Sequence, residues 1–235
     1  MANTALVIGS SGGIGAALVA ALSSHPAYQS LYSQILSLSR NTTPALDYAE
    51  ESSLQLSANW VFEQCTDHPL RLIIVATGFL HSQGAGPERR LAQLDTAYLR
   101  QVFLVNTIGP ALVCKHFEHM LPKDAPFIVA MLSAKVGSVG DNALGGWLGY
   151  RASKTALNQV VKTTSIEWAR RNKHTVCVAI HPGTVATRLS DPFRKKGLQV
   201  RSPEQAALEV LQVLHALSPQ DNGSFVSYDG KTLPW

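Results

Sequence analysis

The sequence predicts one α/β domain over residues 1–235, built on a doubly wound parallel β-sheet with helices on both faces. Two observations predict this fold class. Short apolar runs alternate with longer segments of helical spacing, and a glycine-rich loop follows the first run. Parallel neighbours need long crossovers, and the crossover helices cover both faces of the sheet. The sequence shows no internal repeat and no linker that would divide it.

Six apolar runs have the length and composition of buried strands. They are residues 4–8, 34–39, 71–76, 127–132, 175–180 and 224–227. A weaker run near residues 53–57 is a candidate for an extra strand. The order of strand and helix patterns therefore predicts a sheet of six or seven strands.

Two long segments read as helices: residues 96–121, interrupted by Gly109-Pro110, and residues 149–171. A later helix begins near Ser202, with Pro203 in its first turn and Gln205 at the capping-box position. The polar, irregular segment 188–201 before it is a candidate mobile lid.

The composition is typical of a globular domain, with 46% hydrophobic and 15% charged residues. The net charge of +4 is mild and the basic residues are scattered, which does not favour nucleic-acid binding but allows a basic pocket for a phosphorylated small ligand. The three cysteines are far from any CxxC spacing, so we expect reduced thiols packed as small hydrophobes. The sequence indicates no metal site.

No secretory signal is evident, because the apolar run at residues 5–8 stops at Gly9. The most apolar longer segment, residues 102–114, is too short to cross a bilayer and contains Asn106 and Pro110. We therefore expect a cytoplasmic protein without membrane association.

Glycine and serine dominate the turn after the first predicted strand, which contains Gly9, Ser10, Ser11, Gly13, Ile14 and Gly15. Glycines let the chain turn tightly and let backbone N–H groups approach a pyrophosphate, and the following helix adds partial positive charge. This placement predicts a dinucleotide-binding, Rossmann-type domain. A tight turn with a purely structural role is the alternative.

The end of the second predicted strand favours NADP(H), with NAD(H) as the alternative cofactor. An NAD site uses a carboxylate at this point to bind the ribose 2′-hydroxyl, and here the chain reads Ser39-Arg40-Asn41 instead. The Arg40 guanidinium is suited to a 2′-phosphate, helped by Ser39, Asn41 or Ser10. An exposed arginine without a ligand is the other interpretation.

Tyr150 and Lys154 are four residues apart on a predicted helix, so the phenol and the ammonium share one face. Chance produces this spacing fairly often, but here it follows a strand that ends at Ser133. An ordinary tyrosine pKa is near 10, so roughly 4 kcal/mol of stabilisation is needed for a phenolate at neutral pH. Lys154 and an oxidised nicotinamide are suitable sources, and Ser133 would donate a hydrogen bond to a substrate oxygen.

Asn106 is a further candidate for the site, because of its backbone carbonyl. Pro110 stands four residues later and has no N–H, so the Asn106 carbonyl loses its helical partner and is free to hold a water that connects Lys154 to solvent. A packing kink without function is the alternative.

Together these residues resemble the short-chain dehydrogenase/reductase family across nearly the whole chain. The matching motifs are the GxxxGIG loop from Gly9, the tetrad of Asn106, Ser133, Tyr150 and Lys154, and the run from His181 to Thr187. The resemblance implies a nicotinamide cofactor and frequent dimers or tetramers. It also places Ala76, Gly78, Pro182, Gly183, Val185 and Thr187 beside the cofactor, with Val185 near the carboxamide.

A finer resemblance links the chain to the branch of C-factor and sniffer-like carbonyl reductases, through residues 140–147, 150–158 and 228–235. Two departures from the family affect the adenine side. The NNAG motif is replaced by residues 75–78, where Thr77 is the candidate substitute for the lost side-chain bonds. The aspartate that usually follows the third strand is replaced by Gln55 or is absent.

The leading hypothesis is an NADP(H)-dependent oxidoreductase that transfers a hydride between the cofactor and a small carbonyl or alcohol substrate, with Tyr150 as general acid or base. The alternative is a C-factor-like signalling or nucleotide-sensing protein with little or no turnover. The intact tetrad favours catalysis, because a pure sensor does not need these side chains together.

Candidate walls of a substrate pocket are Phe79, Leu80, His81, Trp147 and residues 188–201. Each of them could equally fill the core or an interface. We expect a homodimer or homotetramer. The substrate and the direction of the reaction stay open at the level of sequence.

Overall fold

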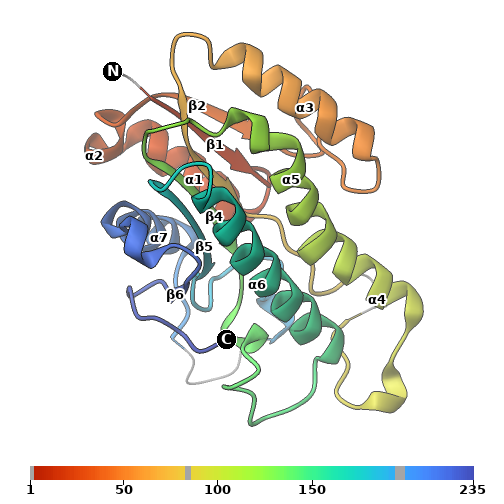
Figure 1. The fold of residues 1–235 in the computed structure, drawn as a ribbon. Coiled ribbons are helices and arrows are strands. Elements are labelled where there is room, and N and C mark those ends of the chain that lie inside the picture. Colours follow the sequence, from red (N-terminus) through yellow and green to blue (C-terminus); the bar gives the residue numbers. More distant parts are fainter. Residues whose placement is uncertain (1–2, 83–85, 194–198) are drawn as a thin grey trace.

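The computed structural model describes residues 3–82, 86–193 and 199–235, and within them the chain forms one six-stranded parallel sheet (Figure 1). Its strands are β1 (Asn3–Ile8), β2 (Tyr32–Leu38), β3 (Leu70–Val75), β4 (Phe127–Leu132), β5 (Thr175–His181) and β6 (Phe225–Ser227). Their order across the sheet is β2-β1-β3-β4-β5-β6. The doubly wound fold and the six predicted strands are confirmed, with ends that differ by one or two residues.

Helices cover both faces of the sheet, and each face has its own apolar core. On one face α1 (Gly13–Ser24) packs against α7 (Pro203–Ala216). On the other lie α3 (Glu51–Gln64), α5 (Gly109–Phe117) and α6 (Leu148–Ala169), with α4 (Thr96–Phe103) leading into α5 (Figure 1). Shorter helical segments are α2 (Pro26–Gln29), Leu91–Gln93, Glu118–Met120, Lys135–Gly137, Asp191–Phe193 and Pro219–Asp221.

The extra strand expected near residues 53–57 is wrong, because this segment belongs to helix α3. Its buried residues Leu54, Ser57, Ala58 and Val61 repeat every three or four positions, which is the period of a helix. Gln55 therefore does not follow a strand, and its side chain contacts His116 (3.0 Å) and Asn59 (3.0 Å). Strand β2 lies at the edge of the sheet.

The helix expected over residues 96–121 is continuous rather than broken at Gly109-Pro110. A π-helical turn, Leu104–Ile108, joins α4 to α5 and takes up the irregularity just before Gly109. The stretch Thr96–Met120 has 25 residues and contains an 18-residue window with a mean hydropathy of 1.2, so it is long and apolar enough to cross a bilayer. The core helix of a globular protein meets the same test, and this stretch packs against α3 and α6.

Helix α7 begins as predicted, with Pro203 as its first residue and the Ser202 hydroxyl accepting a hydrogen bond from the Gln205 N–H (3.1 Å). The Gln205 side chain donates to Glu209 instead of completing a capping box. Part of the candidate lid, residues 194–198, lies outside the described residues. The last residue of the candidate lid, Arg201, forms a β-bridge with Val185.

Gly109 should not tolerate a larger side chain, because an added Cβ would lie 2.1 Å from the ring of Tyr48. We expect Gly109→Ala to lower the free energy of unfolding by about 1–3 kcal/mol, the usual cost of overpacking. Combining it with Tyr48→Leu should recover part of the loss in urea denaturation. Gly140→Ala, where the nearest atom is 3.6 Å away, is the matched control. Equal stability of Gly109→Ala and Gly140→Ala would contradict this packing.

Candidate active site

The loops that follow the strands meet at one edge of the sheet, because all six strands are parallel. Strands β2 and β3 lie on opposite sides of β1, so the chain changes direction there. Such a switch point is where open α/β sheets bind ligands, beyond the carboxyl ends of the strands. The N–H of Gly9 donates to the carbonyl of Leu38 (2.7 Å), and the N–H of Ala76 donates to that of Ile8 (2.7 Å), which draws the three loops together.

The glycine loop needs its glycines. Gly9 has φ of +89°, and a Cβ on Gly15 would lie 2.1 Å from the Gly9 carbonyl oxygen. Helix α1 then begins at Gly13 with no side-chain cap and no acidic residue in its first turn. Its first N–H groups and its dipole are therefore suited to an anion such as a pyrophosphate, and these residues fit a dinucleotide.

Further residues assigned to the cofactor lie around this loop. Thr187 lies against Gly13, where a Cβ would be 2.7 Å from the threonine methyl carbon. Gly78 faces Asn106 and Leu189 at ordinary contact distance. The structure thus brings the loops after β1, β3 and β5 together, as the motifs predicted.

Arg40 follows the carboxyl end of β2 and is exposed. In the described part of the chain its side chain has no ion pair. Ser10 donates through its N–H and its hydroxyl to the Leu38 carbonyl (3.3 Å each), so the glycine loop and the Arg40 turn are adjacent. Asn41 is held by a bond from its N–H to the Ser39 hydroxyl (3.1 Å).

Tyr150 and Lys154 lie on one face of α6, and both are buried. The Lys154 Nζ donates to the carbonyl of Leu132 at the end of β4 (2.8 Å). Burial lowers the pKa of Lys154 to about 7 and raises the pKa of Tyr150 to about 12. The Tyr150 hydroxyl has no hydrogen-bond partner within the described residues. Its raised pKa keeps it protonated at neutral pH in the protein without cofactor.

Ser133 lies beside them at the end of β4. Its hydroxyl donates to Oδ1 of Asn158 (2.7 Å), and its N–H donates to the Ile180 carbonyl (2.8 Å). Asn158 is four residues after Lys154, so a third turn of α6 orients this serine. Sequence reasoning gave Asn158 no role, although its i+4 spacing from Lys154 was the available signal.

Asn106 lies in the π-helical turn and is fully buried. Its side chain accepts from the N–H of Phe79 (2.8 Å), and donates to the Phe79 carbonyl (2.9 Å) and to the Ser153 hydroxyl (3.0 Å). The amide therefore ties the loop after β3 to helix α6. The water-holding role of the Asn106 carbonyl stays a prediction.

The NNAG motif is absent, and the side-chain bonds it would form are replaced by a contact between Thr77 and Tyr48. The sequence pattern did not single out Tyr48. The Thr77 hydroxyl contacts the Tyr48 hydroxyl (3.1 Å), and the Tyr48 ring packs on Gly109. Tyr48 thus joins the segment after β2 to the loop after β3 and to α5. The motif alone could not reveal it, because Tyr48 is distant in sequence.

The run after β5 forms a tight, half-buried loop. Gly183 has φ of +79° and lies against Arg201 and Tyr228. The Arg201 guanidinium stacks on the Tyr228 ring (3.5 Å) and pairs with Glu209 (2.6 Å). Burial lowers the pKa of His181 to about 4, so this imidazole is neutral at physiological pH. Val185 is buried beyond it.

The candidate pocket walls form an apolar cluster around Tyr150. Edge-to-face contacts link Trp147 to Tyr150 (6.3 Å between ring centroids) and Phe193 to both Trp147 (5.1 Å) and His81 (5.5 Å). The other members of the cluster are Phe79, Leu80, Tyr98, Val102, Phe103, Ala134, Val136 and Leu189. Phe79, Leu80 and Trp147 therefore lie in one cluster with Tyr150, and His81 joins through Phe193. Their role as walls of a substrate pocket stays a prediction.

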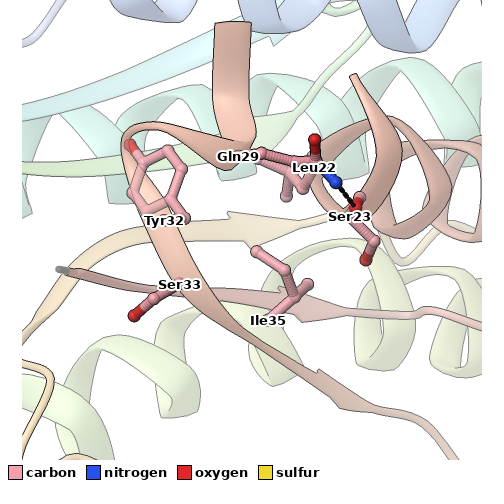
Figure 2. A pocket seen from close by; sticks show the side chains of 6 residues that line it. All are labelled: Leu22, Ser23, Gln29, Tyr32, Ser33 and Ile35. Atoms are coloured by element: carbon pink, nitrogen blue, oxygen red, sulfur yellow. Dashed lines mark hydrogen bonds between the residues drawn. The ribbon is translucent and has the colours of Figure 1, made fainter. Parts of the chain in front are cut away.

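A separate surface hollow of about 400 Å³ lies between α1, α2 and β2 (Figure 2). Tyr32 and Ser33, at the start of β2, line it together with Leu22 and Ser23 near the end of α1 (Figure 2). The start of a parallel strand is at the sheet edge opposite to the candidate catalytic residues. This hollow therefore does not belong to the candidate active site.

A family model described as short chain dehydrogenase matches residues 3–197. The chain belongs to the short-chain dehydrogenase family. The C-signal protein of Myxococcus xanthus is 32% identical over 145 residues, which cover 62% of this chain and 83% of that protein. The 1-hydroxy-2-glutathionyl-2-methyl-3-butene dehydrogenase of a Rhodococcus species is also 32% identical, but the alignment covers 62% of each chain.

Solved structures share the complete fold of this short-chain dehydrogenase. The carbonyl reductase Sniffer of D. melanogaster has a TM-score of 0.84 at 21% identity, with 100% of both chains covered. The NADPH-bound carbonyl reductase from chicken fatty liver has a TM-score of 0.85 at 24% identity, covering 100% of this chain and 94% of that one. The resemblance to the family is confirmed, C-signal is among the relatives of the chain, and the sniffer-like carbonyl reductases share its fold.

Lys154 should titrate near neutrality in the protein without cofactor, because burial disfavours its ammonium form. In NMR of lysine-labelled protein we expect one signal with a pKa of about 7, lost in Lys154→Met. The unfolded chain keeps this proton up to the ordinary value of 10.5, so the contribution of Lys154 to the free energy of unfolding should rise with pH between about 7 and 10.5, measured as the difference between the unmutated protein and Lys154→Met. Lys162→Met, on the same helix, should leave the signal. Titration of every lysine near 10.5 would refute the burial effect.

Proposed function

We propose that this short-chain dehydrogenase is an NADP(H)-dependent oxidoreductase that interconverts a small carbonyl compound and its alcohol, with Tyr150 as general acid or base. The observation that carries the proposal is the burial of Tyr150 and Lys154 on one face of α6, next to Ser133 at the carboxyl edge of the sheet. This edge also carries the uncapped start of α1.

Proton transfer is the task of the protein's own residues in this proposal. The nicotinamide cofactor supplies the hydride that adds to the carbonyl carbon, or accepts it in the reverse reaction. As the C=O bond becomes a single bond, the oxygen takes the phenolic proton of Tyr150. A pKa of about 12 keeps Tyr150 protonated and ready to donate at neutral pH. Lys154, with a pKa of about 7, can return a proton at low energetic cost.

Ser133 holds the substrate oxygen beside Tyr150. Its hydroxyl donates to Asn158 in the structure, so it must rotate to donate to a substrate. Alcohol oxidation requires the reverse proton flow, in which Tyr150 accepts the proton, and an oxidised nicotinamide bound nearby would supply positive charge that favours the phenolate.

NADP(H) is the proposed cofactor, with NAD(H) as the alternative. Support comes from the exposed Arg40 beside the glycine loop and from the NADPH bound to the similar carbonyl reductase from chicken fatty liver. The substrates we propose are modest hydrophobic carbonyl compounds, because aromatic and aliphatic side chains surround Tyr150. A cytoplasmic location and a homodimer or homotetramer stay predictions.

A second candidate function is C-signal-like signalling with little or no turnover. The observation behind it is the 32% identity with the C-signal protein of Myxococcus xanthus. A signalling protein does not need a buried tyrosine and lysine beside a serine, so we place it second.

Arg40 should determine the choice of cofactor. We expect calorimetry to show tighter binding of NADPH than of NADH, and Arg40→Ala to weaken NADPH binding about 10- to 100-fold, since a hydrogen-bonded charge is typically worth about 1.5–3 kcal/mol. NADH binding should not change. Arg170→Ala, another exposed arginine, is the control. Equal affinities for NADPH and NADH in the unmutated protein would sink this assignment.

Tyr150→Phe should keep cofactor affinity and lower carbonyl reduction at least about 100-fold, because the ring is retained while the proton donor is lost. The measurement is NADPH oxidation with aldehydes, ketones and quinones, followed by kcat for each accepted compound. Tyr32→Phe, a buried tyrosine outside the site, should have normal kcat. Near-normal turnover by Tyr150→Phe would remove Tyr150 from the mechanism.

A further inference from the structure

Glu88 is a buried carboxyl group in the segment between β3 and α4, and sequence reasoning assigned it no role. Its side chain is 4% exposed, and its Oε1 atom has no hydrogen-bond partner in the described part of the chain. Burial of an incompletely bonded carboxyl group is unfavourable. An unsatisfied buried group in a native protein therefore needs an explanation, such as a structural or functional role that offsets the cost of its burial.

The contacts of Glu88 converge on the first turn of helix α6. Its Oε2 accepts a hydrogen bond from the Gly149 N–H (3.2 Å), and its backbone carbonyl accepts one from the Trp147 N–H (2.5 Å). Helix α6 begins at Leu148, so Glu88 binds the residues on both sides of the first helical residue.

Helix α6 lacks a cap of its own. Its N-cap residue, Trp147, has φ of 56°, makes no side-chain cap and has an indole that cannot accept a hydrogen bond. The first turn contains no acidic residue. Glu88 supplies from 61 residues away the acceptor that the first N–H groups of a helix require.

The same turn carries Tyr150, the residue after Gly149. A Cβ on Gly149 would lie 2.9 Å from Oε1 of Glu88 and 3.1 Å from the ring of Tyr98. Tyr98 packs in the same apolar cluster as Tyr150, and its hydroxyl donates to the Leu80 carbonyl (3.1 Å). Burial raises the pKa of Tyr98, and the charges of Glu88 and Tyr150 raise it further.

We propose that Glu88 is a positioning residue that holds the first turn of α6 and thereby directs the Tyr150 hydroxyl at the substrate carbonyl. It acts through Gly149 and Trp147 and touches no reacting atom. The inference rests on the proposed function of Tyr150. The expected effect on the rate comes from the orientation of Tyr150, because a displacement of about 1 Å at a reacting group can cost roughly 100-fold in rate.

Two substitutions at Glu88 separate positioning from simple loss of stability. Glu88→Ala removes the acceptor, and we expect kcat to fall about tenfold or more while KM for NADPH and for the carbonyl substrate stays within about twofold. Glu88→Gln keeps a carbonyl oxygen for the Gly149 N–H, so its kcat should stay within about threefold of the unmutated value.

Asp221→Ala is the control for stability. Asp221 caps the short helix Pro219–Asp221 through the Ser218 N–H and hydroxyl (2.8 Å each), just before the start of β6 and away from the carboxyl edge. A kcat of Glu88→Ala equal to that of Asp221→Ala would overturn the inference. If Glu88→Ala does not fold, Glu88→Gln decides alone, and a tenfold loss of kcat in this variant would overturn it.

Hydrogen exchange of the protein without cofactor tests, independently of turnover, whether Glu88 holds the first turn of α6. The amides of Gly149 and Tyr150 should exchange faster in Glu88→Ala than in the unmutated protein, while amides in the middle of α6 keep their protection. Unchanged exchange at the start of α6 would overturn the inference. If the unmutated protein reduces no carbonyl but exchange responds as expected, the proposed function fails, while the role of Glu88 in holding the first turn of α6 is supported.

Discussion

The docking of helix α6 onto the carboxyl end of β4 is the constraint on which the candidate site depends. Lys154 donates to the Leu132 carbonyl (2.8 Å), and the Ser133 hydroxyl donates to Asn158 (2.7 Å). Two successive turns of the helix are thus fixed to the last residue of β4 and to the residue that follows it. Because Tyr150 lies one turn before Lys154 on the same face, these bonds also fix the side of the helix from which its phenol projects.

Burial at this junction determines which protonation states of Tyr150 and Lys154 the protein favours without a cofactor. It raises the pKa of Tyr150 and lowers the pKa of Lys154, so both groups shift toward their neutral forms. A neutral phenol is the form that can protonate a carbonyl oxygen. Carbonyl reduction therefore needs no prior change at Tyr150, whereas alcohol oxidation needs an added positive charge in the site.

The sequence was sufficient where one segment carries its own signal. The six strands, the tight glycine turn after β1 and the cap of α7 at Ser202 all depend on local pattern. The catalytic roles of Asn106, Ser133, Tyr150 and Lys154 stay predictions. The error at residues 53–57 came from taking an apolar run as a strand when its buried positions repeat with the period of a helix. Tyr48 and Glu88 could not be found in this way, since their partners Thr77 and Gly149 are far along the chain.

Trp147 explains why the cap of α6 comes from a distant segment. A serine or aspartate at the N-cap would bond the first turn directly. It would not fill the space between Tyr150 and Phe193, where the indole packs at 6.3 Å and 5.1 Å from the two rings. The left-handed backbone of Trp147 costs about 1–3 kcal/mol. Residue 147 therefore serves the wall of the candidate pocket, and Glu88 provides both the missing acceptor and the bond that holds the strained residue in place.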